Sequence, residues 1–554
     1  MPKRLAIVLA FAVVCAAATA SAQTQSEAAA DTPAADAAAA AFSPVTWERL
    51  LHAADEPQNW LMYSGTFDSQ RHSRLEQVHT RNVDELELKW AYQIPEIDRA
   101  ETTPLVVDGV MFVTEAPSNV VALDAATGGR YWRYEHELPD DLRICCGRNN
   151  RGVAILGETL YMSTLDAHLV AIDARTGNLV WNREVADHQA GYSKTAAPLI
   201  VRDQVVTGIA GGEYGIRGFL DSYDAETGEQ EWRAWTIPGP DHPDNRTWSG
   251  DSWRTGGSPT WITGSYDPDL DLVYWGTGNP GPDWNGDVRL GDNLYADSAL
   301  ALDGETGDLK WYFQFTPHDV HDWDAIQIPI LGDIMYEGEM RKVMMWANRN
   351  AFYYTLDRET GEFLVGTPFA EQTWAEGLDE NGRPIRVPNT APTPEGVVVS
   401  PPIGGGTNWW SPAYSPRTGL FYVNAFDGEQ EYFTREEEYV EGETYMGGGG
   451  NNVLPIDHYQ SYIRALDPAT GNLRWEYPIA PRSTSGLLST EGDLVFGGTV
   501  DGWFFALDAL TGEELWHINV GSRVHSGPMA YAVDGRQYVA VAAGNVVFAF
   551  GLDD

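Results

Sequence analysis

A short pattern recurs along this chain: Asp, two residues, Thr-Gly, three residues, Trp. Two incomplete copies are TLDRETGEFLV (355–365), in which Val365 replaces Trp, and AYSPRTGLFYV (413–423), in which Ser415 replaces Asp. The complete copies are ALDAATGGRYW (122–132), AIDARTGNLVW (171–181), SYDAETGEQEW (222–232), ALDGETGDLKW (301–311), ALDPATGNLRW (465–475) and ALDALTGEELW (506–516).

The spacing of the copies predicts the fold. Their first residues lie 49, 51, 79, 54, 58, 52 and 41 residues apart, and repeats of about 40 to 50 residues with strand–turn–strand patterning are typical of propeller blades. Asp and Gly supply a tight turn between strand-forming residues, and each Trp can pack against a neighbouring blade. We therefore predict an all-β, eight-bladed β-propeller that forms one domain over residues 43–554. The longest gap holds extra residues, and such insertions usually carry function.

The N-terminus reads as a targeting segment. Lys3 and Arg4 precede an apolar run, and Ala20-Ser21-Ala22 is typical of a cleavage site. We predict a signal peptide over residues 1–22, a disordered Ala-rich leader over 23–42, and release into the periplasm. No later run is long and apolar enough to predict a membrane span.

The charge of the chain excludes one class of partner. It has 36 Lys and Arg residues against 80 Asp and Glu residues, a net charge of -44. Such a surface repels a phosphate backbone, so we expect no nucleic acid partner. The charge can serve solubility alone or the docking of a cationic protein.

Two adjacent cysteines, Cys145 and Cys146, follow the predicted signal peptide in a compartment where thiols oxidise. Consecutive Cα atoms lie only ~3.8 Å apart, so the pair can close only as a strained eight-membered ring. Such features tend to occur at functional sites. The alternative is two ordinary buried thiols.

The repeats, together with ICCGRNNRG (144–152), AGGEYG (210–215) and PHDVHDWD (317–324), resemble the pyrroloquinoline quinone (PQQ)-dependent alcohol and methanol dehydrogenases from about Trp60 to Leu552. The soluble type without a haem domain is the nearest match. The resemblance implies that the Cys145–Cys146 ring lies on one face of PQQ and Trp261 on the other, although Trp261 could be an ordinary core residue. The further cofactor contacts that it implies are Glu101, Arg151, Thr195, Gly211, Gly212, Arg349 and Asn408.

The same resemblance implies one metal ion. Its ligands would be Glu213, Asn279, Asp322 and Asp324, since hard cations prefer carboxylate and amide oxygens. Asp324 lies two residues after Asp322, so on an extended segment both carboxylates point the same way. This extra charge favours a trivalent lanthanide, with Ca²⁺ as the alternative. The sequence departs from the family pattern at His321, where Trp is usual, and a zinc site on His318 and His321 is a weaker reading of the same segment.

The implied reaction is oxidation of a small alcohol to an aldehyde. Asp322 would take the hydroxyl proton, Arg349 would keep that carboxylate ionised, and hydride would pass to metal-bound PQQ. No Cys-x-x-Cys-His is present, so the electrons would go to a separate cytochrome c. Sugars or polymeric alcohols are alternative substrates, and a propeller scaffold without activity is a third reading. No Gly-x-Gly-x-x-Gly between a strand and a helix suggests a nicotinamide cofactor. The oligomeric state, with a homodimer as one option, is left open.

Overall fold

The computed structural model describes residues 42–96, 99–453, 455 and 459–553. The predicted signal peptide lies outside these residues, as does the predicted leader apart from Phe42. Phe42 is buried, and its ring packs edge-on against Phe112 with the ring centroids 6.0 Å apart. Phe42, the last residue that we assigned to the disordered leader, is therefore packed into the fold.

Strands dominate, and in the described part of the chain eight sheets contain four or five strands each. The first four sheets are β3 (Leu105–Val107), β4 (Val110–Glu115), β5 (Asn119–Asp124) and β6 (Arg130–Tyr134); β7 (Ala154–Leu156), β8 (Thr159–Ser163), β9 (His168–Asp173) and β10 (Leu179–Glu184); β11 (Leu199–Val201), β12 (Gln204–Gly208), β13 (Phe219–Asp224) and β14 (Gln230–Trp235); and β15 (Ser265–Asp267), β16 (Leu272–Gly276), β17 (Ser298–Asp303) and β18 (Leu309–Gln314).

The other four sheets follow the same plan. They are β19 (Ile330–Tyr336), β20 (Glu339–Ala347), β21 (Phe352–Asp357) and β22 (Phe363–Pro368); β26 (Ala413–Ser415), β27 (Leu420–Asp427), β30 (Gln460–Leu466) and β31 (Leu473–Ile479); β32 (Leu488–Thr490), β33 (Leu494–Gly498), β34 (Trp503–Asp508) and β35 (Glu514–Asn519), with β1 (His72–Ser73) beside β32; and β36 (Met529–Val533), β37 (Arg536–Ala543), β38 (Val546–Gly551) and β2 (Glu87–Gln93).

Smaller elements lie between the sheets. They are β23 (Ala375–Leu378) with β24 (Pro384–Arg386); β25 (Val397–Val399), β28 (Gln430–Thr434) and β29 (Gly448–Asn452); helix α2 (Trp47–Leu51); and the 3₁₀ turns η1 (Ala53–Asp55), η2 (Val83–Glu85), η3 (His188–Ala190), η4 (Gly212–Tyr214), η5 (Pro243–Thr247), η6 (Ser252–Thr255) and η7 (Gly286–Val288). No helix among the described residues is long and apolar enough to cross a membrane.

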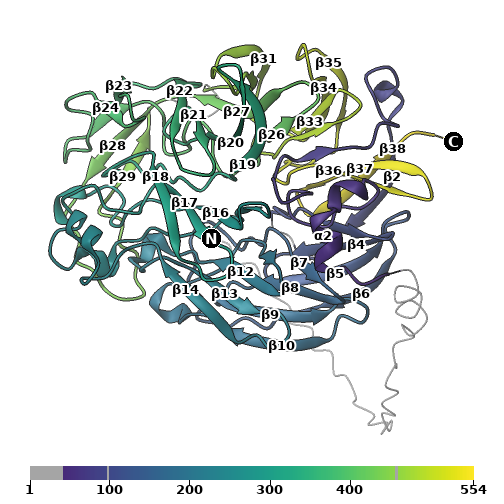
Figure 1. The fold of residues 1–554 in the computed structure, drawn as a ribbon, viewed down its shortest axis with the longest axis horizontal. Coiled ribbons are helices and arrows are strands. Elements are labelled where there is room, and N and C mark those ends of the chain that lie inside the picture. The colour runs from purple at the N-terminus through teal and green to yellow at the C-terminus, as the bar shows by residue number, and fades with distance from the viewer. Residues whose placement is uncertain (1–41, 97–98, 454, 456–458, 554) are drawn as a thin grey trace, which may run out of the picture.

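The two ends of the chain share the last sheet. β2 pairs with β38 in antiparallel register, with Trp90 opposite Ala549, and Figure 1 shows the purple β2 beside the yellow β37 and β38. Burial falls from the first strands, such as β3, to the fourth strands, such as β10. The sheets therefore bury their first strands and expose their last, as propeller blades do.

The repeat does not mark one copy per sheet, and this part of our prediction is wrong. Seven copies join the third and fourth strands of a sheet, but residues 413–423 form the first hairpin, β26–β27, of a sheet that has a second copy at 465–475. The last sheet has none, because its third strand, β38, and its fourth, β2, come from opposite ends of the chain.

The predicted packing of the repeated Trp is confirmed. Trp132 donates its indole N–H to the carbonyl of Ala174 at 3.1 Å in the next sheet. A Cβ on Gly177, in the turn of that sheet, would lie 2.6 Å from the Trp132 ring. Trp90 packs in the same way on Gly128, although it follows no copy of the motif. Each indole therefore joins one sheet to the turn of the next.

The order of the strands divides the molecule into two edges. In a four-stranded antiparallel meander, the connection from strand two to strand three and the connection to the next sheet emerge at the same edge. We call this the loop edge. The hairpins from strand three to strand four, which carry the repeat, lie at the opposite edge, which we call the repeat edge.

Candidate active site

All of the predicted site residues lie in connections at the loop edge, although they are spread over about 300 positions of sequence. The sheet order therefore collects them on one face of the molecule. They are Glu101 after β2; Cys145, Cys146 and Arg151 after β6; Thr195 after β10; Gly211, Gly212 and Glu213 after β12; Trp261 after β14; Asn279 after β16; Asp322 and Asp324 after β18; Arg349 after β20; and Asn408 between β25 and β26.

Arg151 connects several of these residues. Its Nη2 lies 2.7 Å from Glu101 Oε2, and its guanidinium lies over the rings of Trp261 (5.1 Å) and Trp409 (4.5 Å). Its backbone N–H donates to the carbonyl of Thr195. Arg151 is buried, yet its Nε and Nη1 have no hydrogen-bond partner among the described residues. Buried donors of this kind are costly unless paired, so the site fits a planar anionic ligand.

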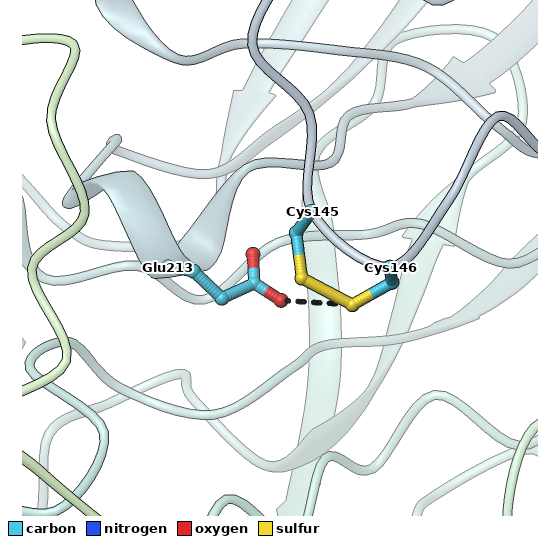
Figure 2. A group of neighbouring side chains, drawn as sticks. All are labelled: Cys145, Cys146 and Glu213. Carbon is cyan, nitrogen blue, oxygen red and sulfur yellow. Dashed lines mark hydrogen bonds between the residues drawn. A yellow bond between two sulfur atoms is a disulfide. The ribbon is translucent and has the colours of Figure 1, made fainter. Parts of the chain in front are cut away.

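The disulfide lies beside the predicted metal ligand Glu213. Cys145 and Cys146 are bonded to each other, and Figure 2 shows the Glu213 carboxylate directed at them, with Oε1 3.8 Å from Cys146 Sγ. Gly211 has φ 119°, and a Cβ there would lie 2.2 Å from the carbonyl of Gly191. Only glycine therefore allows the turn that presents Glu213.

Buried carboxylates gather around Asn279. Its backbone N–H donates to Asp324 at 2.8 Å, and its side-chain amide donates to Asp283 at 3.0 Å. Burial, with Asp324 nearby, raises the pKa of Glu213 to about 7, and burial with Glu213 raises the pKa of Asp283 well above its usual range. Because buried like charges disfavour ionisation, a cation would stabilise this group, and its oxygen donors suit a hard metal ion.

Glu213, Asp322 and Asp324 do not have ligand atoms that all lie within 4.8 Å of one another in this structure. Among the described residues, the only three His, Cys, Asp or Glu side chains with possible ligand atoms all within 4.8 Å of one another are Cys145, Cys146 and Glu213. The two sulfurs there are bonded to each other, so that group offers no thiolate. Gly212, which precedes Glu213, does lie near Asn279, since a Cβ on Gly212 would be 3.8 Å from Asn279 Oδ1.

Arg349 joins the two aspartates of the HDWD segment. It forms a short ion pair with Asp324 and lies 3.5 Å from Asp322 through Nη2. Asp324 is the closer partner, whereas we expected Asp322. Burial raises the pKa of Asp322 well above its usual range, although Arg349 acts in the opposite direction. Arg349 therefore favours the ionised form of Asp322, as we predicted, while burial and the neighbouring carboxylates oppose it.

His321 lies in an aromatic group and beside one carboxylate, with its Nδ1 3.8 Å from Asp319 Oδ1. Its ring stacks on Trp323 with the centroids 4.2 Å apart and lies edge-on to Tyr432, and its Nε2 is 2.9 Å from the carbonyl of Thr390. His318 instead contacts the carbonyl of Gly291. The two histidines do not meet in any three-residue metal group among the described residues.

The sequence analysis missed two acidic residues and one aromatic residue. Asp283 bonds to Asn279, and Asp319 accepts the backbone N–H groups of His321 and Trp323, which fixes the loop that presents Asp322. Trp409 covers Arg151. The only signal was position: Asp283 lies in the turn after Asn279, and Asp319 lies within PHDVHDWD. Asn408 uses its side-chain amide within its own loop, on Gly404 and Trp409.

Comparison with known proteins agrees with this geometry. Residues 60–377 and 478–539 match the family described as PQQ: Glucose/ethanol/alcohol dehydrogenase, beta-propeller domain. The quinoprotein alcohol dehydrogenase PedH of Pseudomonas putida is 39% identical over 92% of this chain and 89% of its own length. The 1-butanol dehydrogenase (quinone) of Thauera butanivorans is 35% identical over 91% of this chain and 90% of its own.

Solved structures show the same similarity. The quinohemoprotein alcohol dehydrogenase from Comamonas testosteroni superposes with a TM-score of 0.88 at 34% identity, over 94% of this chain and 84% of that one. A europium-containing methanol dehydrogenase superposes with a TM-score of 0.86 at 32% identity, over 91% of this chain and all (100%) of that one. The chain has the β-propeller fold and belongs to the PQQ-dependent alcohol dehydrogenases, a family of oxidoreductases.

Proposed function

We propose that the protein oxidises a small primary alcohol to its aldehyde in the periplasm and passes the electrons to a separate cytochrome c. The eight sheets would form the eight blades of one ring, with the loop edge facing the substrate. The arrangement that carries the proposal is Asp322 and Asp324 on either side of Arg349, next to the buried oxygen donors around Asn279.

The residues around Arg151 would hold PQQ. Arg151 has two buried nitrogens without partners, and Trp261 and Trp409 present flat faces beside them. Cys145–Cys146 would cover the cofactor from another side. When bound, PQQ supplies the two-electron oxidant of the reaction, which the side chains of this protein lack.

A trivalent lanthanide is the metal that we favour, with Ca²⁺ as the alternative. Glu213, Asp322 and Asp324 were predicted as ligands with Asn279, and Asp283 adds a fourth carboxyl group, which is buried next to Asn279. More negative charge around a site favours a more highly charged ion. The structural similarity to a europium-containing methanol dehydrogenase supports the same choice.

The protein's own part in the chemistry is proton transfer and orientation. Asp322 is partly exposed, with 18% of its side chain accessible, so an alcohol can reach its carboxylate. We propose that Asp322 accepts the hydroxyl proton of the alcohol as general base. Arg349, 3.5 Å away, favours the ionised form that can accept this proton.

A reconstitution experiment tests the proposal. Metal-free protein loaded with PQQ is titrated with La³⁺ or Ca²⁺ and assayed with an artificial electron acceptor on ethanol, 1-butanol and glucose. We expect turnover of both alcohols, little of glucose, and higher rates with La³⁺. Asp324→Ala should lower the La³⁺-supported rate by roughly 100-fold while PQQ absorbance is retained.

The same experiment can contradict each part. Turnover of glucose without alcohols would overturn the substrate class. Full activity with Ca²⁺ and none with La³⁺ would overturn the preference for a lanthanide. Asp324 would then be a positioning residue that acts through Arg349.

A further inference from the structure

The loop edge carries a second group of polar residues that the proposed reaction does not use. Arg99 follows β2, Arg482 lies between β31 and β32, and Arg523 and His525 lie between β35 and β36. We call these four residues the arginine cluster. All three connections run from the fourth strand of one sheet to the first strand of another, so they emerge at the loop edge, as the predicted active site does.

Backbone hydrogen bonds hold these loops together. Gly544 donates its N–H to the carbonyl of Arg523 and accepts the N–H of Ala100, at 2.8 Å in both cases. Val500 donates to the carbonyl of Arg482, and Val524 donates to the neighbouring Thr499. The arginine cluster is therefore one surface.

Two positive charges of this cluster, on Arg482 and Arg523, lack acidic partners among the described residues. Neither Arg482 nor Arg523 forms an ion pair with any described residue, although most other arginines of this acidic chain do. Burial and the nearby Arg523 lower the pKa of Arg482. Asp501, the acidic residue of the adjacent loop, accepts a short hydrogen bond from Thr499 instead. The local field is therefore positive in a chain with a net charge of -44.

His525 adds an unsatisfied polar atom. It is 6% exposed, and its Nε2 has no hydrogen-bond partner among the described residues. Its Nδ1 lies 3.2 Å from the hydroxyl of Thr484. Burial, together with Arg523, Arg99 and Arg482, lowers the pKa of His525 to about 3. The ring is therefore neutral, and when Thr484 donates to Nδ1 the proton lies on Nε2, which can donate to a ligand.

The cluster touches the active site through the disulfide. Arg99 donates from Nη2 to the carbonyl of Cys146 at 2.5 Å, and Cys146 Sγ lies 3.8 Å from Glu213 Oε1. Arg99 therefore links the arginine cluster to the disulfide that lies beside Glu213.

We propose that Arg482, Arg523 and His525 bind a carboxylate at the far end of the substrate, so that the enzyme favours alcohols that carry a carboxylate, such as ω-hydroxycarboxylates. Guanidinium groups suit carboxylates because they donate two parallel hydrogen bonds, and the neutral imidazole adds a third donor. Elsewhere the acidic surface repels such anions, so a local positive entrance is needed to admit them. This inference rests on the proposed function.

The test compares 6-hydroxyhexanoate with 1-hexanol, which has the same carbon chain without the charge. We expect the reconstituted wild-type holoenzyme to have the higher kcat/KM on 6-hydroxyhexanoate. The double variant Arg482→Gln/Arg523→Gln should lose roughly tenfold of kcat/KM on 6-hydroxyhexanoate, mainly through KM, and keep its rate on 1-hexanol. Raising the salt concentration should weaken the preference for 6-hydroxyhexanoate.

Two controls separate the possible outcomes. Arg130→Gln removes an exposed arginine at the repeat edge and should change neither substrate. PQQ binding to the metal-loaded apoprotein is measured by absorbance. If the double variant loses PQQ affinity and both substrates suffer alike, the cluster binds a carboxylate of the cofactor and the inference is overturned. Equal kcat/KM values for the two substrates in wild type, or no effect of the variant on 6-hydroxyhexanoate, also overturn it. Failure to oxidise 1-hexanol at all would instead contradict the proposed function.

Discussion

The two edges of the sheets are built by different kinds of interaction. At the repeat edge, the turns are built from local contacts: Asp124 accepts the N–H groups of Ala126 and Thr127 within a single turn. At the loop edge, contacts join distant segments: Asn279 donates to Asp324 across 45 positions. Local contacts repeat along the sequence, whereas the distant contacts occur once each.

This difference separates stability from chemistry. The repeated Asp, Gly and Trp residues set the turns and the packing between sheets, and seven of the eight sheets carry a copy of the repeat between their third and fourth strands. The loop edge holds single residues that no other part of the molecule replaces. Substitutions at the loop edge should therefore abolish activity in a folded protein, and substitutions at the repeat edge should weaken folding in an active one.

The largest expected effect is at the loop edge. Asp322→Asn removes the proposed base and should lower kcat by about 10³-fold or more, since general-base catalysis contributes on the order of 10²–10⁴. The melting temperature and PQQ absorbance should stay at wild-type values. Asp303→Asn, at the repeat edge, is the matched control and should keep full activity. A cofactor-loaded Asp322→Asn enzyme with normal turnover would remove Asp322 from the mechanism.

The sequence predicts the repeat edge well because its turns are local and its packing recurs from sheet to sheet. The turn, the adjacent strands and the packing of Trp132 follow from residue type and spacing. The prediction of one copy per sheet failed in two places. Residues 413–423 form the first hairpin of a sheet, and Trp90 packs against the turn of the next sheet although it follows no copy of the motif. A Thr-Gly turn fits any tight hairpin, so the motif does not specify which pair of strands it joins.

The site residues at the loop edge could be predicted only from the family resemblance. Glu101, Arg151, Thr195 and Trp261 do contact one another in a chain of bonds and ring contacts. Asp283 was not predicted as a site residue because its role depends on its hydrogen bond with Asn279 and on its burial. Sequence spacing reveals neither of these. The orientation of His321, stacked on Trp323, depends in the same way on tertiary packing.

Alanine substitutions at two glycines, Gly177 and Gly419, test how tightly the sheets pack against each other. Gly177 and Gly419 have φ values of 74° and 68°, so alanine costs about 1 kcal/mol at either position for the left-handed backbone. At Gly177 the new Cβ would also lie 2.6 Å from Trp132, whereas at Gly419 nothing lies within 4 Å. Overpacking of this kind costs about 2 kcal/mol more.

Urea unfolding of Gly177→Ala and Gly419→Ala should show that difference, with kcat unchanged in both folded proteins. Equal losses of unfolding free energy would mean that the indole moves aside freely and that Trp132 does not fix the spacing of the sheets.

The smallest effect concerns charge in one turn. Asp303 accepts the N–H groups of Glu305 and Thr306, and its Oδ2 lies 3.0 Å from the Lys310 ammonium. Partial burial would raise the pKa of Asp303, but Lys310 and these N–H groups outweigh it and lower the pKa to about 2. In the unfolded chain an aspartate titrates near ~3.9. The stabilisation from the ionised carboxylate is therefore complete above about pH 4 and is lost as the pH falls towards about 2.

Asp303→Ala should lower the unfolding free energy by about 1 kcal/mol at pH 7, as loss of a turn-capping side chain does, and by less at pH 3. Asp303→Asn keeps an acceptor oxygen without the charge, so its unfolding free energy should approach that of wild type as the pH falls from 5 to 3. Urea unfolding at pH 7, 5, 4 and 3 measures both variants, and a gap between wild type and Asp303→Asn that stays constant over this range would show that the charge on Asp303 contributes nothing to the turn.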